Sequence, residues 1–182
     1  MDIFETIAAK YLENNGYWVR RSLKLDISKE EKKALGTQTM PRPEIDLVAY
    51  KPCRNELVLF EVKSFLYGPG VTIDPILGKG RYSKRYRLFN NNKFQKCVSK
   101  QLVFKLMEEG LISGKVKVRY GLICGNVYKR DSERIEKLFC KKGWVLIKPE
   151  DIRQWVRDYS EKGWDDDPVV LTAKLLEPLL KD

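Results

Sequence analysis

The feature that most constrains this chain is a pair of apolar segments, residues 45–50 and 56–65, separated by a short segment that contains proline and asparagine. Two such segments on either side of a short connection predict an antiparallel β-hairpin. The second segment is apolar from Leu57 to Phe60 but ends in Glu61-Val62-Lys63, and the first carries Asp46. Charged groups at the end of a core strand cost free energy unless they have a partner or a task.

The elements around this hairpin follow from apolar periodicity and from glycine and proline. The segments 28–43 and 67–92 are rich in polar or turn residues; we expect a short helix or loop in the first and a long loop in the second. Helices are expected over 2–15, 93–109, 132–142, 149–160 and 169–180, and further strands over 17–25, 116–124 and 144–147. This order predicts one α/β domain over residues 1–182, with a mixed central sheet flanked by helices.

Composition limits the chemistry that such a domain can perform. The chain has no histidine, which excludes Ser-His-Asp and Cys-His nucleophiles and histidine-based nucleases and metalloproteases. Its four cysteines are scattered without a Cys-x-x-Cys pair, which disfavours a zinc site or a disulfide framework. No GxxxxGK[ST] motif occurs, so a phosphate-binding loop is not expected. Hydrolytic chemistry must therefore use carboxylates, lysine and a hard metal ion.

Charge and hydropathy indicate the partners and the compartment. The formal net charge is +10, and a basic surface attracts polyanions, nucleic acid first and anionic membrane second. No apolar run approaches the roughly 20 residues that span a bilayer. The first residues are amphipathic and contain acids, unlike a secretory signal or a transit peptide. We expect a cytoplasmic protein without a membrane partner.

The charged end of the hairpin has the composition of a divalent-metal site. Side chains alternate faces along a strand, so Glu61 and Lys63 share a face, and Asp46 can approach them from the neighbouring strand. Mg²⁺ prefers oxygen ligands and needs only one or two carboxylates besides water and phosphate, and the backbone carbonyl of Val62 could add a ligand. Lys63 could hold the attacking water and offset charge in the transition state. The alternative is a salt bridge at the end of a strand.

At these residues the sequence resembles the PD-(D/E)XK nuclease superfamily, whose pattern is an acid on one strand and Asp/Glu-x-Lys on the next. Here the pattern reads Pro43-Glu44-Ile45-Asp46 and then Glu61-Val62-Lys63, with the leading proline displaced. The resemblance implies a restriction-endonuclease-like core over about 2–125, with a C-terminal extension over 126–182. It also implies a further metal-binding acid on the first helix, Glu5 or, as the alternative, Glu13.

Within that superfamily the chain looks most like the small cleavage subunit of heterodimeric type IIS restriction endonucleases. This implies Mg²⁺, for which Mn²⁺ could substitute, double-stranded DNA as substrate, and a larger subunit that recognises the site and cuts the other strand. An alternative is a homodimeric Holliday-junction resolvase or a Mrr-like nuclease. A further alternative is a non-catalytic module for DNA binding or assembly.

A basic segment follows the hairpin and is the candidate DNA contact. Residues 75–107 contain nine lysines and arginines and no acid. Such side chains neutralise phosphates, while Tyr82 and Tyr86 could stack or pack against sugar. A solvated basic loop and a contact with an acidic partner are the alternatives. Gln101 on the following helix is a weaker candidate for the site. The residues expected to bind DNA are Arg81, Lys84, Arg85, Arg87, Lys93 and Lys96.

Overall fold

The apolar hairpin lies in the middle of a five-stranded sheet with strand order β1-β2-β3-β4-β5. The computed structural model describes residues 3–36, 39, 41–113, 115–161, 163 and 166–176. The strands are β1 (Trp18–Lys24), β2 (Glu44–Lys51), β3 (Glu56–Lys63), β4 (Lys117–Cys124) and β5 (Val145–Ile147). The pairs β1–β2 and β2–β3 are antiparallel, and the pairs β3–β4 and β4–β5 are parallel. The sheet is therefore mixed, as the sequence predicted.

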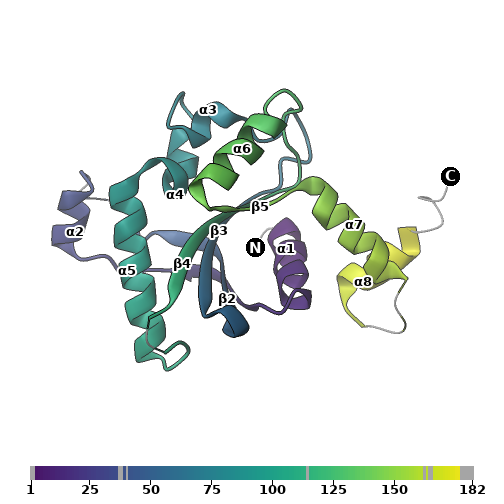
Figure 1. The fold of residues 1–182 in the computed structure, drawn as a ribbon, viewed down its shortest axis with the longest axis horizontal. Coiled ribbons are helices and arrows are strands. Elements are labelled where there is room, and N and C mark those ends of the chain that lie inside the picture. Colours follow the sequence, from purple (N-terminus) through teal and green to yellow (C-terminus); the bar gives the residue numbers. More distant parts are fainter. Residues whose placement is uncertain are drawn as a thin grey trace.

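Helices cover both faces of this sheet, with α5 on one side and α1 on the other (Figure 1). The N-terminal half contributes α1 (Ile3–Asn14), α2 (Lys29–Ala34), the single turn η1 (Pro52–Arg54) and α3 (Ile73–Ile76). Next come η2 (Ser83–Tyr86), α4 (Arg87–Asn90) and α5 (Asn92–Glu108), and the C-terminal part adds α6 (Ser132–Lys142), α7 (Pro149–Ser160) and α8 (Pro168–Leu176). The α/β class with flanking helices is confirmed, and residues 177–180 of the expected last helix lie outside the described residues.

Strand alternation divides the core into two clusters, one on each face of the sheet. Leu47, Val58 and Phe60 are fully buried against α1 and α7. Leu57 and Leu59 point to the other face, where they pack with side chains from α5 and α6. Because Glu61 and Lys63 continue the odd-numbered row of β3, their side chains lie on the face that α5 and α6 cover.

Residues 67–92 do not form the continuous loop expected from the sequence. They contain α3, η2 and α4, and the apolar side chains of these turns are buried in the core. Asn90 holds the segment together, because its Nδ2 donates hydrogen bonds of 2.9 Å to the carbonyls of both Pro75 and Ser83. Asp131 joins it to the start of α6 by accepting a 3.0 Å hydrogen bond from the amide of Ile73. The glycines and prolines therefore separate short anchored turns.

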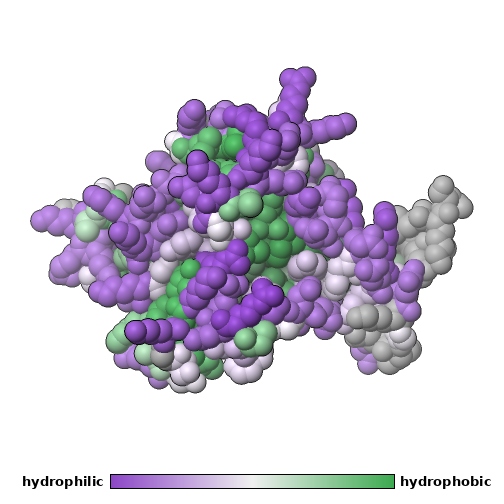
Figure 2. Space-filling view, viewed as in Figure 1, coloured by the Kyte–Doolittle hydropathy of each residue, from purple (hydrophilic) through white to green (hydrophobic). Residues whose placement is uncertain are grey.

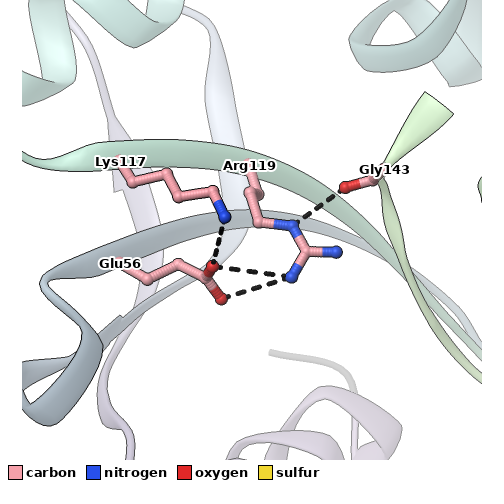
Figure 3. Close-up of polar contacts among 4 residues, drawn as sticks. All are labelled: Glu56, Lys117, Arg119 and Gly143. Carbon is pink, nitrogen blue, oxygen red and sulfur yellow. Dashed lines mark hydrogen bonds and ion pairs between the residues drawn. The ribbon is translucent and has the colours of Figure 1, made fainter.

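An ion cluster around the buried Glu56 fixes the end of the sheet where β3 begins (Figure 3). Glu56 is only 3% exposed, and both of its carboxylate oxygens lie within 3.5 Å of Nη1 of Arg119 on β4. Lys117 approaches the same carboxylate to 3.6 Å, and Nε of Arg119 donates to the carbonyl of Gly143. The cluster thus joins β3, β4 and the turn before β5 at the end of β3 remote from Lys63.

In the part of the chain that the structure describes, no helix has the length and apolar character needed to cross a membrane.

Candidate active site

The site lies where β2 and β3 separate. The last main-chain pair of the two strands is Leu47 with Phe60. Beyond this pair, the amide of Val62 donates a 2.7 Å hydrogen bond to the side-chain Oδ2 of Asp46. The carboxylate of Asp46 is therefore held at the opening between the strands by the backbone of the residue between Glu61 and Lys63.

The carbonyl of Val62 faces the same edge as Asp46. On the other side of β3, the carbonyl of Lys63 accepts a hydrogen bond from the amide of Gly125, which follows β4. Main-chain groups alternate direction along a strand, so those of Val62 point away from β4 and toward β2. A carbonyl and a carboxylate oxygen thus share one opening, as the metal-site hypothesis for Val62 requires.

Lys63 is surrounded by acids. Its Nζ forms an ion pair with Oε1 of Glu61 and lies 3.9 Å from Oδ2 of Asp46. The side chains of the three residues are between 16% and 23% exposed, so the group is neither in bulk solvent nor sealed in the core. A partly buried pair is screened less by salt than a surface pair, so the charges interact strongly.

The first helix brings Glu5 to this group and leaves Glu13 away from it. Glu5 lies in the first turn of α1 and is close enough to Glu61 to raise the pKa of that carboxyl electrostatically. Glu13 is exposed in the last turn of the same helix, next to the loop that leads to the far end of β1. Of the two acids considered from the sequence, Glu5 is thus the one near Asp46, Glu61 and Lys63.

The electrostatics of the group disfavour the ionised form of Glu61. The pKa of this carboxyl is raised to about 7, chiefly by burial and also by the negative charges of Asp46 and Glu5, against the opposing effect of Lys63. Asp46 and Glu61 both form ion pairs with Lys63, and Glu5 acts on Glu61 from nearby. A divalent cation bound here would favour the ionised form of Glu61, and its preference for oxygen ligands matches these carboxylates.

The carboxylates do not enclose an ion by themselves. Among the described residues, no three acidic or thiol side chains are close enough together to form a complete metal cage. Mg²⁺ does not need such a cage, because it retains several waters and is usually bound through one or two carboxylates and the phosphates of its substrate. Asp46, Glu61 and the carbonyl of Val62 would form an open site of that kind.

Tyr86 covers the group on one side and corrects an expectation from the sequence. Its ring centroid lies 6.0 Å from Nζ of Lys63, and the residue is only 2% exposed. Burial and the neighbouring charge of Glu61 raise the pKa of the Tyr86 hydroxyl above its ordinary value, so the ring stays neutral. A buried ring cannot pack against the sugars of DNA, and Tyr86 instead shields Lys63 from solvent. No local sequence signal distinguishes it from Tyr82, which is 45% exposed.

The basic segment reaches the site through Arg85. Arg81 and Arg85 stack on the ring of Tyr82, with guanidinium carbons 4.6 and 5.1 Å from its centroid. Arg85 is also close enough to Tyr86 to oppose the rise in the pKa of its hydroxyl. Among the expected phosphate contacts, the side chains exposed to solvent are Arg81, Lys84, Arg85, Lys93 and Lys96.

Arg87 and Gln101 differ from what the sequence suggested. Arg87 is half-buried, with its guanidinium 4.2 Å from the ring centroid of Phe94, and burial lowers its pKa. It therefore helps to pack η2 and α4 on α5 and is a weaker candidate for a phosphate contact. Gln101 donates a 2.7 Å hydrogen bond to Oε1 of Glu31, so it joins α5 to α2 and has no contact with Glu61 or Lys63.

A groove lined mainly by apolar side chains lies beside α5, away from these charged residues. Figure 2 shows hydrophobic side chains along β4 beside α5, on a face that is otherwise largely hydrophilic. The groove there has a volume of about 630 Å³ and is lined mainly by Val103, Phe104, Met107 and Val118. It has no acidic lining residue, so the carboxylate chemistry belongs to the opening between β2 and β3.

Comparisons of the chain with models of protein families, with curated proteins and with solved structures find no match.

Proposed function

We propose that this protein is a Mg²⁺-dependent DNA endonuclease that hydrolyses a phosphodiester on one strand. The observation that carries the proposal is the half-buried group of Asp46 and Glu61 around Lys63, with Glu5 nearby, at the opening between two strands. Asp46 and Glu61 present carboxylate oxygens at the same opening as the carbonyl of Val62. Oxygen donors of this kind are the ligands that a hard divalent cation prefers, so the group favours a site that also holds a cation.

The residues divide the work of hydrolysis between them. Asp46, Glu61 and the carbonyl of Val62 would hold the metal, with Glu5 adding negative charge at its edge. The bound metal would polarise the phosphate and lower the pKa of a coordinated water. Lys63 carries three N–H donors, so it can keep its ion pair with Glu61 and still donate to the attacking water or to a phosphate oxygen. Asp46, held by the amide of Val62, keeps its position while these charges change.

DNA is the substrate that the surrounding charge favours. The exposed cations of residues 81–96 lie on the segment before α5 and on the first turns of α5, and Arg85 lies next to the tyrosine that covers Lys63. Lysine and arginine neutralise backbone phosphates irrespective of sequence. They would hold a strand across the opening with one phosphate beside Lys63.

One such site cuts one strand, so a double-strand break requires a second site. We propose that this second site belongs to a larger subunit that also recognises the DNA sequence, as in heterodimeric type IIS restriction endonucleases. The bound metal would be Mg²⁺, with Mn²⁺ able to replace it. The alternative arrangement is a homodimer with two copies of this site, and plasmid cleavage distinguishes it from the heterodimer.

The test is cleavage of a supercoiled plasmid by the purified chain, alone and with candidate larger subunits, in Mg²⁺, in Mn²⁺ and with the metals chelated. Nicked product from the chain alone, or linear product only with a partner, supports the heterodimer. Linear product from the chain alone, formed in a single binding event, supports a homodimer instead. No cleavage under any of these conditions, with DNA binding intact, would contradict the nuclease and leave a binding module.

A further inference from the structure

A cleft of about 440 Å³ opens beside the candidate active site and has no part in the mechanism above. Its floor includes the half-buried ring of Phe65 and the buried ring of Tyr86. Its rim is exposed and carries Tyr67, Tyr82 and Arg85. Because Tyr86 lines the cleft and also lies 6.0 Å from Nζ of Lys63, a ligand in the cleft would be one side chain away from the catalytic lysine.

The rim combines an unusually exposed aromatic ring with positive charge. Tyr67 is 96% exposed, although a tyrosine ring normally gains free energy by burial. Across the cleft, the guanidinium groups of Arg81 and Arg85 stack on the ring of Tyr82. A ligand that satisfies such a cleft has a flat apolar part for the rings and an anionic part for the arginines. A nucleotide has both.

Residues 64–70 form the wall of the cleft that carries Tyr67, and the segment after β4 fixes this wall at both ends. At one end, a Cβ on Gly125 would lie 2.3 Å from the carbonyl oxygen of Ser64, so the two backbones are in close contact. At the other, a Cβ on Gly70 would lie 2.7 Å from the backbone of Asn126. Between them, Nδ2 of Asn126 donates a 3.0 Å hydrogen bond to the carbonyl of Gly68. The wall is therefore held in place before any ligand binds, which lowers the entropic cost of binding.

The backbone conformation of Phe65 is a second feature that points to a functional role for this wall. It has a φ of 36°, in the left-handed region that non-glycine residues rarely adopt. Such a conformation persists only when the surrounding structure enforces it. Here it turns the chain out of β3 directly after the catalytic lysine and lets the Phe65 ring line the cleft.

We infer that this cleft binds one unpaired nucleobase of the DNA strand, next to the phosphate that lies at Lys63. The inference rests on the proposed function and adds that the substrate is locally unstacked at the cut. A base within a continuous duplex is stacked between its neighbours and cannot enter, whereas an unpaired base can stack on the exposed ring of Tyr67. Arg85 would neutralise the phosphate of the same nucleotide.

The test is DNA binding measured without divalent metal, so that hydrolysis is not required. Two fluorescent duplexes are compared by anisotropy: one has a single unpaired thymidine at its centre, and the other has an abasic unit there. The variants are Tyr67→Ala and Tyr67→Phe. The matched control is Trp18→Ala, because Trp18 is also exposed, at 64%, but lies at the start of β1 at the far end of the sheet.

The wild type should bind the thymidine duplex more tightly than the abasic duplex, by about 5- to 150-fold, the range expected for one stacked base. Tyr67→Ala should abolish this difference, while Tyr67→Phe and Trp18→Ala should retain it. Equal affinity for the two duplexes, a difference that survives Tyr67→Ala, or no saturable binding would each overturn the inference.

The outcomes separate this inference from the nuclease proposal. Plasmid cleavage without any preference for the unpaired base would overturn the cleft assignment alone. A preference that depends on Tyr67, in a protein that never cleaves DNA, would overturn the nuclease and leave a module that binds unpaired bases.

Discussion

The amide of Val62 donates a 2.7 Å hydrogen bond to Oδ2 of Asp46 at the point where β2 and β3 separate. This single contact explains how a charged residue can end a core hairpin, because Asp46 provides the acceptor that the neighbouring strand no longer supplies. It also fixes one carboxylate beside the opening that Glu61 and Lys63 line. Asp46 therefore has a structural role that a conservative substitution can separate from its charge.

The two acids of the first helix provide a matched pair of variants. Glu5→Gln removes a negative charge that acts on Glu61, so we expect DNA cleavage to slow by about 10- to 100-fold, as for residues that support metal ligands. Glu13→Gln, at the other end of α1, should leave the cleavage rate unchanged. Single-turnover cleavage rates at saturating Mg²⁺ provide the comparison. Equal rates for the two variants would remove Glu5 from the site.

Glu61 should make the metal-free protein less stable as pH rises. Its pKa is about 7 in the folded protein and 4.5 as its ordinary value, so the folded state holds this proton more tightly than the unfolded chain. The stabilisation is complete below about pH 4.5 and is lost as pH rises through 7. It amounts to at most about 3 kcal/mol, from 1.36 kcal/mol per pH unit.

Urea unfolding of the metal-free protein between pH 5 and 8 measures this effect. Glu61→Gln cannot ionise, so its free energy of unfolding should fall less over this range than that of the wild type. Glu133→Gln, an exposed carboxylate on α6, is the control and should follow the wild type. Parallel pH profiles for wild type and Glu61→Gln would show that Glu61 ionises normally. Mg²⁺ should recover part of the loss in the wild type, because it favours the ionised carboxyl.

The ion cluster around the buried Glu56, at the other end of β3, predicts an effect on stability. Glu56→Ala removes the acid that Arg119 and Lys117 share and should lower the free energy of unfolding by about 1–3 kcal/mol, because both cations remain partly or largely exposed to solvent. The exposed pair of Glu133 with Lys137 on α6 is the comparison, and Glu133→Ala should change stability very little. Chemical denaturation at pH 7 measures both. Similar losses for the two variants would show that Glu56 behaves as a surface residue.

The hairpin and the relative placement of its charges could be predicted from sequence because they depend on local rules. An apolar run of strand length with a short turn specifies two paired strands, and the two-residue period places Glu61 and Lys63 on one face. The antiparallel pairing then brings Asp46 within reach. The mixed order of the sheet followed from the alternation of strand and helix patterns after residue 93.

The features that could not be predicted depend on how distant segments pack. Spacing along α1 does not say which end of the helix meets the strand ends, so Glu5 and Glu13 could be distinguished only in three dimensions. Tyr86 and Tyr82 have the same local pattern, but only Tyr86 packs into the core. The turns within residues 67–92 are held by hydrogen bonds that Asn90 donates and that Asp131 accepts. Both residues are remote in sequence from some of the groups they bind.

The most direct test of the proposed active site is the rate of Mg²⁺-dependent DNA cleavage by Asp46→Asn, compared with wild type and Asp26→Asn. The asparagine keeps an oxygen that can accept from the amide of Val62, so the strands should stay in place while the negative charge is lost. Asp26 is an exposed acid that pairs with the exposed Arg42, and it serves as the control. We predict loss of cleavage in Asp46→Asn alone, with folding and DNA binding retained. Cleavage at the wild-type rate by Asp46→Asn would show that the carboxylates at this opening do not form the active site.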